Sequence, residues 1–560
     1  MARSLPPKQP ARRFPGSRLL TSRHGGLASL LAATLLIASC GGGGGAEEPA
    51  PPAPPAPPTG VDAQAVVVSA PLPMPAGCGG DSAGTAYIGA EAEPFVAVNP
   101  RDTQHLVAIW QQDRYGGGAA RALGLAVSFD GGRRWGQHQL LPFSRCGGAL
   151  PGSPGDFARA TDPWVDFGPD GQVHVMGLAL SVGALLPGSS SAMLAARSSD
   201  GGRSFAAAQQ LVLDGPTLFN DKNALTADPT DPRYVYAVWD RIDNNDNGPT
   251  LLARSVTAGA SWEPAREIYV PRVPAGSSGS SQTIGNRIVV RPDGGLVNVF
   301  TQIDTVAGRE EAWLGVIRSG DKGQTWSAPV RIAALQAVGA KDPQTGKAIR
   351  DGAILASIVA APDGSLTVAW QDARFSGGQR DAIVISRSGD GGSSWSVPRA
   401  VNRVATSAAF TPTLAVRADG RLGLLHYDLR EDTADASTLL ASAWLLSSGD
   451  GGQTWTETRV REAFDLNRAP DSRGWFLGDY QGLVASGTAW VAVFVATTAD
   501  AANRSEVYAL RVEASGAGAP SRAQPLNLGV QRAVPADTPA FAQARREAIQ
   551  RSLQLWRRPR

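Results

Sequence analysis

Cysteine and histidine are both scarce in this chain of 560 residues, which has three cysteines and five histidines. They lack the close His/Cys spacing of a structural zinc site, which argues against a zinc protein. The apolar run Leu27–Ala38 is too short to span a bilayer as a mature helix. Glycine (65) and proline (41) are abundant, whereas only 18% of the residues are charged, and this composition favours many turns and short strands.

Positive charge is scarce outside the two ends of the chain. The formal net charge is +2, but twelve of the 52 Lys and Arg residues lie within residues 1–39 and 541–560. The remainder carries 40 basic and 49 acidic residues. Because phosphate binding needs clustered cations, this acidic body argues against a nucleic acid partner.

The N-terminus has the features of a targeting segment. Arg12, Arg13, Arg18 and Arg23 precede the apolar run, which ends in Leu36-Ile37-Ala38-Ser39-Cys40, a sequence that resembles a bacterial lipobox. The resemblance implies cleavage before Cys40 and acylation of its thiol; an ordinary secretory signal is the alternative. We therefore expect a signal peptide over residues 1–39 and a Gly/Pro/Ala-rich tether over 40–62. The protein would then be secreted across the inner membrane and lipid-anchored, facing the periplasm or the cell surface.

Cys78 and Cys146 remain once Cys40 is assigned to the anchor. Both lie in glycine-rich loops, and in an oxidising compartment two remaining cysteines are expected to form one disulfide. Two free thiols are the alternative.

An octapeptide of the pattern S-x-D-x-G-x-x-W recurs along the chain. Its copies are Ser128–Trp135, Ser198–Phe205, Ser319–Trp326, Ser388–Trp395 and Ser448–Trp455, with a degenerate copy at Ser255–Trp262. Three short apolar runs separated by Gly/Pro/Asp turns accompany each copy. A further unit that begins at Tyr480 lacks the octapeptide.

Regularly spaced apolar runs of this kind indicate antiparallel strands in repeated sheets. We expect an all-β protein, a β-propeller of four-stranded antiparallel blades over residues 63–515. Seven blades are predicted, and six, with the last unit as an extension, is the alternative. The segment Gln64–Ala70 would supply the missing strand of the last unit and close the ring. Residues 516–560 are expected to form a basic, partly helical tail, lying either on anionic lipid or on the propeller.

The octapeptides match the Asp box of BNR-repeat proteins, so the chain resembles the sialidase superfamily over roughly residues 90–512. In the box, the Asp carboxylate is expected to accept backbone N–H groups of its own turn, and the aromatic residue to pack between sheets. This role is structural. Since successive strands reverse direction, the box shares one face with the turns between first and second strands, and the ligand face should be the opposite one.

Charged residues gather on that opposite face. Four second strands end in a carboxylate followed closely by a guanidinium: Asp113/Arg114, Asp240/Arg241, Asp372/Arg374 and Asp428/Arg430. The first strands are preceded by Glu93, Asp162, Asp221 with Lys222, Arg350 with Asp351, and Asp479. The recurring pairs either line a ligand site or connect each blade to the next by ion pairs.

The family resemblance implies an exo-sialidase with an arginine cluster, an Asp acid/base and a Tyr nucleophile activated by Glu. By position these are catalytic Asp113, Tyr480, Glu310 and Glu311, with substrate-binding Arg114, Arg241, Arg287, Arg374 and Arg430. The family's Arg-Ile-Pro motif is absent from the first blade, where Glu93-Pro94-Phe95 stands instead, and Arg287-Ile288 occurs only in the fourth.

Three functional hypotheses follow from these assignments. The first is a hydrolase acting on sialic acid or a related acidic sugar, and the second a non-catalytic protein that binds glycan or protein. The third is a hydrolase of neutral polysaccharide with paired carboxylates. In each case the expected partners are a glycan or glycoprotein ligand and a membrane, contacted by a monomer through its lipid anchor.

Asp243, Asn245 and Asn247 match the opening of a calcium loop, in which alternate side-chain oxygens reach one cation. The twelfth position holds Arg254 rather than Glu, which excludes an EF-hand. A plain turn rich in Asp and Asn is the alternative, so no cofactor is expected beyond this possible Ca²⁺.

Overall fold

The computed structural model describes residues 65–79, 84–181, 185–273, 276–513 and 538–553. These residues form β-strands and one α-helix, so the predicted all-β class is confirmed. The lipobox with Cys40, the tether and most of the C-terminal tail lie outside the described residues. Within them, no helix combines the length and the apolarity that crossing a bilayer requires.

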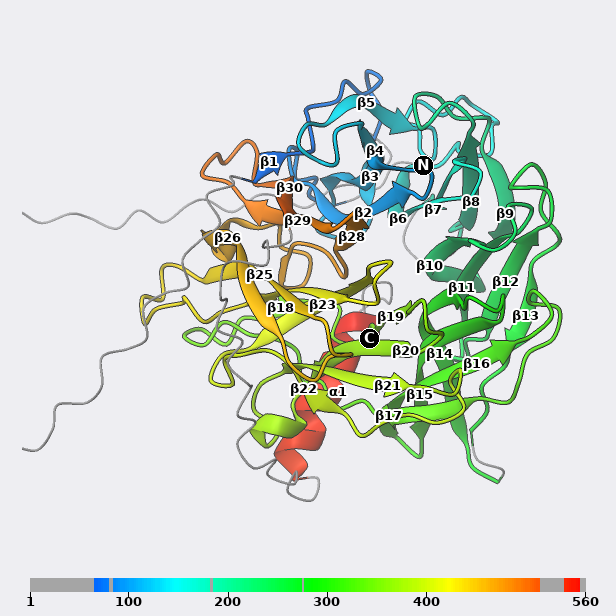
Figure 1. The fold of residues 1–560 in the computed structure, drawn as a ribbon. Helices are drawn as coiled ribbons and strands as arrows, with labels where there is room; N and C mark the ends of the chain where they lie inside the picture. The colour runs from blue at the N-terminus through cyan, green and yellow to red at the C-terminus, as the bar shows by residue number, and fades with distance from the viewer. Residues whose placement is uncertain (1–64, 80–83, 182–184, 274–275, 514–537, 554–560) are drawn as a thin grey trace, which may run out of the picture. The chain divides into compact units, whose positions relative to one another are not determined.

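The strands form antiparallel four-stranded units in chain order (Figure 1), which we number as sheets one to seven. Sheet one contains β2 (Ala92–Asn99), β3 (Asp102–Arg114), β4 (Ala120–Ser128) and β5 (Gly136–Leu141). Sheet two contains β6 (Arg159–Phe167), β7 (Val173–Leu180), β8 (Ser191–Ser198) and β9 (Gln209–Asp214). A single residue pair, Ala120 and Ala160, joins β4 to β6.

The remaining sheets repeat this order. Sheet three contains β10 (Leu218–Ala227), β11 (Val235–Asp243), β12 (Thr250–Ser255) and β13 (Arg266–Tyr269). Sheet four contains β14 (Gly279–Val290), β15 (Leu296–Val306), β16 (Arg309–Ser319) and β17 (Val330–Ala334). Sheet five contains β19 (Ser357–Ala360), β20 (Leu366–Asp372), β21 (Ala382–Ser388) and β22 (Arg399–Ala400). Sheet six contains β23 (Ala409–Val416), β24 (Leu422–Asp428), β25 (Leu440–Ser448) and β26 (Thr456–Asp465).

Sheet seven is assembled from both ends of the fold. It contains β28 (Gly482–Ser486), β29 (Ala489–Thr497), β30 (Ser505–Val512) and β1 (Val66–Val67). Val66 pairs with Ala509 and Val67 with Tyr508, so the strand expected within Gln64–Ala70 is present. A short parallel pair, β18 (Ile349–Arg350) with β27 (Trp475–Phe476), and two 3₁₀ turns, Arg374–Ser376 and Leu466–Arg468, connect the sheets.

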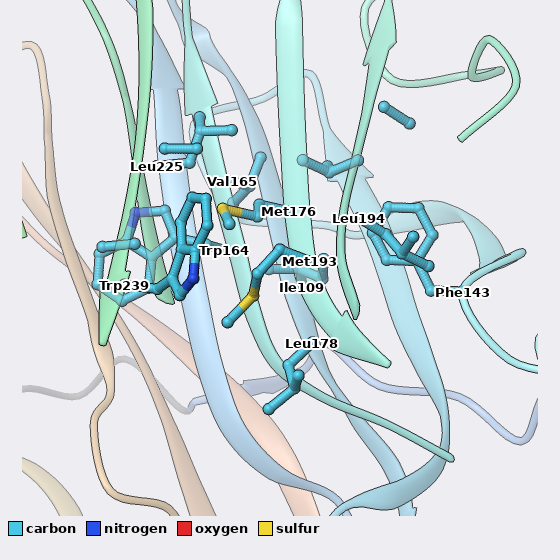
Figure 2. Packing of buried hydrophobic residues seen from close by; sticks show 14 of the residues in the cluster. Ile109, Phe143, Trp164, Val165, Met176, Leu178, Met193, Leu194, Leu225 and Trp239 are labelled. Carbon is cyan, nitrogen blue, oxygen red and sulfur yellow. The ribbon is translucent and has the colours of Figure 1, made fainter. Parts of the chain in front are cut away.

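The core lies between neighbouring sheets. Second strands such as β3 are buried over most of their length because both faces are covered, and Trp110, Trp239 and Trp370 of three second strands are fully buried. Figure 2 shows Ile109, Trp164, Met193 and Trp239 of sheets one, two and three in one apolar cluster. First strands contact one another in order from β2 through β6, β10, β14, β19 and β23 to β28, and β28 contacts β2.

Each octapeptide forms the turn between a third and a fourth strand. In the last copy, Asp450 Oδ1 accepts hydrogen bonds from the backbone N–H groups of Gln453 and Thr454, both at 2.9 Å. Ser448 Oγ accepts from the N–H of Gly452 at 2.8 Å. Burial opposes ionisation, but the hydrogen bonds from Thr454 and Ser448 together outweigh it and lower the pKa of Asp450 to about 2. The predicted turn chemistry is confirmed.

The turns also pack against the preceding sheet. A Cβ atom added at Gly452 would lie 2.8 Å from Ile385 of sheet five, and one at Gly132 would lie 2.9 Å from Val491 of sheet seven. In the degenerate copy Thr257 replaces the aspartate, and its Oγ1 accepts from the N–H of Ser261 at 2.9 Å. The octapeptides therefore connect neighbouring sheets, as predicted.

The disulfide between Cys78 and Cys146 is present, as expected. It attaches the segment that follows β1 to the loop after β5.

The helix α1 (Pro539–Leu553) packs against the sheets. The N–H of Phe541 donates to Thr538 Oγ1 at 3.2 Å, and this hydrogen bond caps the N-terminus of the helix. Phe541 is buried with Val338 and Ala373, and Ile549 joins the apolar core around sheets four and five. The tail was expected either on anionic lipid or on the folded sheets, and α1 lies on the sheets.

Candidate functional site

Five first strands carry a β-bulge near their start, in β2, β6, β10, β14 and β23. One residue of each bulge has a left-handed backbone: Glu93 (φ 51°), Asp162 (φ 50°), Lys222 (φ 45°), Gly285 (φ 67°) and Thr411 (φ 52°). Four of these are not glycine, and such strain persists only where the surrounding structure enforces it. Strain is therefore concentrated where the first strands meet.

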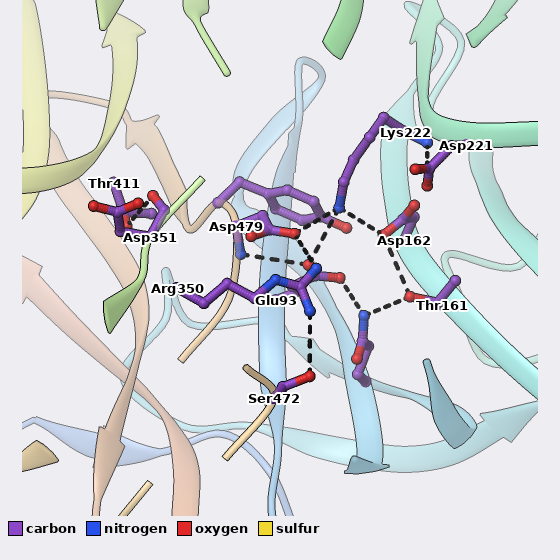
Figure 3. A network of polar contacts seen from close by, with 12 residues as sticks. Glu93, Thr161, Asp162, Asp221, Lys222, Arg350, Asp351, Thr411, Ser472 and Asp479 are labelled. Carbon is purple, nitrogen blue, oxygen red and sulfur yellow. Dashed lines mark hydrogen bonds and ion pairs between the residues drawn. The ribbon is translucent and has the colours of Figure 1, made fainter. Parts of the chain in front are cut away.

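Charged side chains from the bulges of β2, β6 and β10, together with side chains from the end of β3, from β18 and from the segment before β28, form what we call the central polar cluster. Its members are Glu93, Arg114, Asp162, Asp221, Lys222, Arg350 and Asp479. Lys222 Nζ lies 2.7 Å from Asp479 Oδ2 and 3.3 Å from Asp162 Oδ1. It also lies 3.6 Å from Glu93 Oε1 (Figure 3). One ammonium group thus connects the first strands of sheets one, two and three with the segment that precedes β28.

Two arginines complete the cluster. Arg350 Nη2 lies 2.7 Å from Asp479 Oδ2. The guanidinium carbons of Arg114 and Arg350 each lie 4.3 Å from the centre of the Phe476 ring, and both groups donate to Ser472 Oγ at 3.3 Å. These arginines are engaged within the protein and do not present a free pair of guanidinium groups to a ligand.

Burial and charge act against each other in the cluster. Burial, only partly offset by Lys222, raises the pKa of Glu93 to about 8 and that of Asp221 to about 7. Burial also opposes ionisation of Asp479, but the charges of Arg350 and Lys222 hold its pKa well below the usual range. Although burial disfavours the ammonium form, the surrounding carboxylates raise the pKa of Lys222 well above its ordinary value.

The cavity beside the cluster is small, at about 60 Å³. Pockets for sugars and other small molecules usually measure about 300–1,000 Å³, so this space suits a few water molecules rather than a sugar ring. Arg287 lines it, donating to Ser357 Oγ at 3.2 Å, with its guanidinium carbon 5.3 Å from the centre of the Trp164 ring.

Tyr480, the predicted nucleophile, lines the same cavity. Its hydroxyl donates to the carbonyl oxygen of Pro163 at 3.2 Å. Burial, with the charge of Glu93, raises the pKa of Tyr480 well above its ordinary value. A tyrosine nucleophile needs a neighbouring base that favours loss of the proton, and this environment does the opposite.

Glu310 and Glu311, the predicted partners of Tyr480, lie on β16 and do not line this cavity. Glu310 accepts a hydrogen bond from Gln550 of α1 at 3.4 Å. The structure does not bring these two carboxylates to the tyrosine.

Three of the five predicted arginines form ion pairs away from the centre. Arg374 pairs with Asp372 at 2.7 Å, within its own sheet. Arg430 contacts Asp428 at 2.5 Å and Glu457 at 2.7 Å, also within its sheet. Arg241 lies 3.7 Å from Asp214 on β9 of the preceding sheet and 3.5 Å from Glu267 on β13. Among these three, Arg241 alone forms an ion pair with the preceding sheet, whereas the ion pairs of Arg374 and Arg430 stay within their own sheets. The expected connection of one sheet to the next by ion pairs is therefore seen for Arg241 only.

A larger cavity of about 650 Å³ lies between sheets one and seven, and we call it the first–last cleft. Its walls come from segment 69–77, which leads to the disulfide, from residues 88–91 with the end of β3, and from the turn between β29 and β30. A turn between second and third strands lies at the strand ends opposite the octapeptides. The cleft therefore opens on the predicted ligand face, away from its centre.

Asp113, the predicted acid/base, lines the first–last cleft. Its backbone is left-handed (φ 59°), and its carboxylate accepts from the N–H of Gly89 at 3.0 Å. Arg121 Nη1 lies 2.8 Å from Asp113 Oδ2. Of the predicted catalytic residues, only Asp113 lies in a cavity large enough for a sugar.

Glu91 is a second carboxyl group of the cleft, and it was missed from the sequence. It is 4% exposed, Oε1 accepts a hydrogen bond from Gln112, and Oε2 has no hydrogen-bond partner among the described residues. Burial, with a contribution from Asp113, raises the pKa of Glu91 to about 8. The sequence shows an acidic residue at this position, but it does not show which residues lie beside it in space.

The candidate calcium loop forms a closed turn. Asp243 Oδ1 accepts from the N–H groups of Asn245 at 2.8 Å and Asn247 at 2.9 Å. Within the described residues, no group of three or more His, Cys, Asp or Glu side chains could hold a metal ion. These contacts are those of the plain Asx turn.

Comparison with known proteins supports the repeat assignment. Residues 234–499 match the family described as the BNR repeat-like domain, so the predicted resemblance to BNR-repeat proteins of the sialidase superfamily is confirmed over that segment. No curated protein matches the chain.

Several solved structures are similar to the chain. One is the Hadza microbial sialidase Hz136, at 16% identity over 73% of this chain and 76% of that one, with a TM-score of 0.43. A protein of unknown function from Dyadobacter fermentans has 14% identity over 80% of this chain and 98% of that one, with a TM-score of 0.42. An ulvan lyase of polysaccharide lyase family PL25 has 11% identity over 76% of this chain and 95% of that one, with a TM-score of 0.46. No functional conclusion rests on likenesses at this level.

Proposed function

We propose that the chain is a seven-bladed β-propeller that binds the end of a glycan chain in the first–last cleft. The observation that carries the proposal is the contrast in size: about 650 Å³ around Asp113 against about 60 Å³ at the centre. Only the larger volume lies in the range of small-molecule sites. The BNR repeat match makes a glycan the first ligand class to test.

Three observations support a closed ring of seven blades rather than six with an extension. The first strand of sheet seven contacts the first strands of both sheet six and sheet one. The N-terminal strand β1 pairs with β30 and completes four strands in sheet seven. The octapeptide of sheet one packs on Val491 of sheet seven, as the other octapeptides pack on the sheets before them.

The walls of the cleft have the mixed character of a sugar site. Gln112 and Asn503 supply amide groups, whereas Leu72 and Ile88 supply apolar surface. The disulfide on the cleft wall suits an oxidising compartment and so supports export. We extend the proposal to anchoring through Cys40 and to a monomer at the membrane surface.

The binding proposal is tested with the full chain on a glycan array, followed by calorimetry with the oligosaccharides that bind. Ala502 is exposed and lines the cleft, so Ala502→Trp should obstruct it and weaken binding at least tenfold. The exposed neighbour Ala501 does not line the cleft, and Ala501→Trp is the matched control. Absence of any glycan ligand, or equal weakening by both variants, would contradict the proposal.

Hydrolysis of a sialoside at the central cavity is a second candidate, favoured by one observation. Arg287 lines that cavity without an ion pair among the described residues, and burial lowers its pKa to about 10. An anion would compensate this charge. Release of fluorophore from a fluorogenic α-sialoside, lost in both Tyr480→Phe and Arg287→Met, would establish this activity, and no turnover by a folded chain would exclude it for that substrate.

A further inference from the structure

Glu91 is held between the two sheets that form the first–last cleft. Its N–H donates to the carbonyl oxygen of Ser505 at 3.1 Å, and Ser505 Oγ donates to the carbonyl oxygen of Glu91 at 2.9 Å. Ser505 begins β30, whereas Glu91 immediately precedes β2. The backbone of Glu91 is thus positioned by both walls, and its side chain lines the cavity.

The Glu91 carboxyl group has an unused hydrogen-bonding atom. Oε2 is buried and has no partner among the described residues, and an orphaned buried polar atom calls for an explanation. A neutral carboxylic acid carries its proton on one oxygen and can donate it to an acceptor. The arrangement leaves Oε2 available for this role.

Asp113 occupies the same cleft in a different environment. Arg121 pairs with its carboxylate at 2.8 Å, and the N–H of Gly89 donates to the same carboxylate at 3.0 Å. Its left-handed backbone places the side chain at a strained position, which is typical of functional residues. Among its carboxyl groups the cleft therefore contains one that is buried without an ion pair to the described residues, Glu91, and one that is paired with a cation, Asp113.

The remaining charges of the cleft select against anionic ligands. Asp500 and Glu506 also line it, and Arg121 is the one lining residue with a positive charge among the described residues. The charge of Arg121 is already engaged by Asp113. A sugar bearing a carboxylate or sulfate would meet a net negative wall, so an uncharged sugar fits this cleft better.

Resting on the proposed function, we propose that the first–last cleft hydrolyses the glycosidic bond of an uncharged sugar, with Glu91 as proton donor and Asp113 as base. The protonated Glu91 transfers its proton to the glycosidic oxygen as the bond from that oxygen to the anomeric carbon breaks. Asp113 removes a proton from the water that attacks the anomeric carbon. One water is consumed, two hydroxyl groups result, and proton exchange with solvent resets both carboxyl groups.

The protonation state of Glu91 agrees with its role as proton donor at neutral pH. Burial first, then the charge of Asp113, raises the pKa of Glu91 to about 8, although the hydrogen bond from Gln112 acts against the shift. A group that donates a proton must keep it until the reaction, so activity should decline above about pH 8. Acid and base catalysts that act as a pair are commonly two titratable groups to which their environments give different pKa values.

The test uses the full chain with 4-methylumbelliferyl glycosides of neutral hexoses and pentoses, and neutral oligosaccharides with detection of new reducing ends. Glu91→Gln and Asp113→Asn should each lower kcat about 10²- to 10⁴-fold while glycan binding is retained. The alkaline decline near pH 8 should disappear from the residual activity of Glu91→Gln. Glu513→Gln, an exposed residue at the octapeptide ends of the strands, is the control, and circular dichroism with Tm verifies folding.

The outcomes separate this inference from the binding proposal. Glycan binding without turnover of any neutral probe, or turnover unaffected by Glu91→Gln, overturns the hydrolase and leaves the binding site intact. Faster turnover of sialosides or uronides than of neutral glycosides overturns the substrate class. Absence of any glycan binding removes the proposed function and this inference together.

Discussion

The central polar cluster and the first–last cleft are built from the same structural positions, namely the starts of first strands and the ends of second strands. In the cluster, Lys222 and Arg350 compensate the carboxylates of Asp162 and Asp479, and the neighbouring cavity is small. In the cleft, Glu91 keeps an unpartnered oxygen beside a volume about ten times larger.

The difference follows from where the repeat is interrupted. Sheets one to six each carry an octapeptide and four consecutive strands, and all of them but sheet five have a β-bulge with a left-handed residue in the first strand. Sheet seven has no octapeptide and takes its fourth strand from the N-terminus. The segment that follows this strand, residues 69–77, forms a wall of the cleft. The open site thus lies where the repeat breaks, and the regular positions are used for stability.

The largest expected effect tests whether the central cluster is structural. Lys222→Met removes the cation shared by three carboxylates and should lower the free energy of unfolding by about 3–5 kcal/mol, because buried charges lose their partner. Lys341→Met removes a largely exposed pair with Glu547 and should cost less than about 1 kcal/mol. Urea unfolding measures both, and equal effects would show that the cluster contributes no more than a surface pair.

Reduction of the disulfide tests the wall of the cleft. The bridge closes a loop with a sequence separation of 68, and its loss should destabilise the chain by about 2–4 kcal/mol. Because segment 69–77 lines the cleft, glycan affinity should fall as well. Calorimetry with and without reductant measures this. The double variant Cys78→Ser/Cys146→Ser should bind as the reduced protein does, with no response to reductant.

The titration of Glu91 sharpens the contrast between the two regions. Since its folded pKa is raised from 4.5 to about 8, the folded state holds a proton that the unfolded state releases above pH 4.5. Its contribution to stability should therefore decline between pH 4.5 and about 8, by at most about 1.4 kcal/mol per pH unit. Glu91→Gln should show a flatter dependence in thermal unfolding across this range. Parallel curves for both proteins would place the carboxyl group in water.

The smallest expected effect concerns the octapeptides on the other face. Asp450→Ala removes acceptors for two backbone N–H groups and should cost about 1 kcal/mol while glycan binding is unchanged. Because the pKa of Asp450 is depressed to about 2, the difference in Tm should be full above pH 3.8 and shrink as the pH falls toward 2. A lower glycan affinity of Asp450→Ala would contradict this prediction, because it would show that the octapeptide turn affects binding on the opposite face.

Local patterns predicted the fold well but the site only in part. The turn chemistry of the octapeptides depends on residues within five positions of one another, and the disulfide on only two remaining cysteines. Asp113 was also placed on the ligand face from strand parity. The sequence did not decide the partners of Arg374 and Arg430, because a charged pair at the end of a strand is compatible with a ligand site and with an ion pair.

Residues that depend on distant segments were missed or assigned to other partners. Glu310 contacts α1 rather than Tyr480, and the tyrosine hydroxyl is used by Pro163 of sheet two. Glu91 lies beside Ser505, 414 positions along the chain. No repeat period or turn signal carries information about such a contact.

The sequence by itself determined the all-β class, the recurring Asp-box turns, the pairing of Cys78 with Cys146 and the face on which charged residues gather. These depend on apolar periodicity, turn chemistry and strand parity, which act over a few residues or on few possible partners. The tertiary structure alone decided which charges cancel at the centre and which carboxyl group stays unpaired at the edge. Burial and ion pairing depend on the approach of segments that are far apart in the chain, and no local pattern specifies that approach.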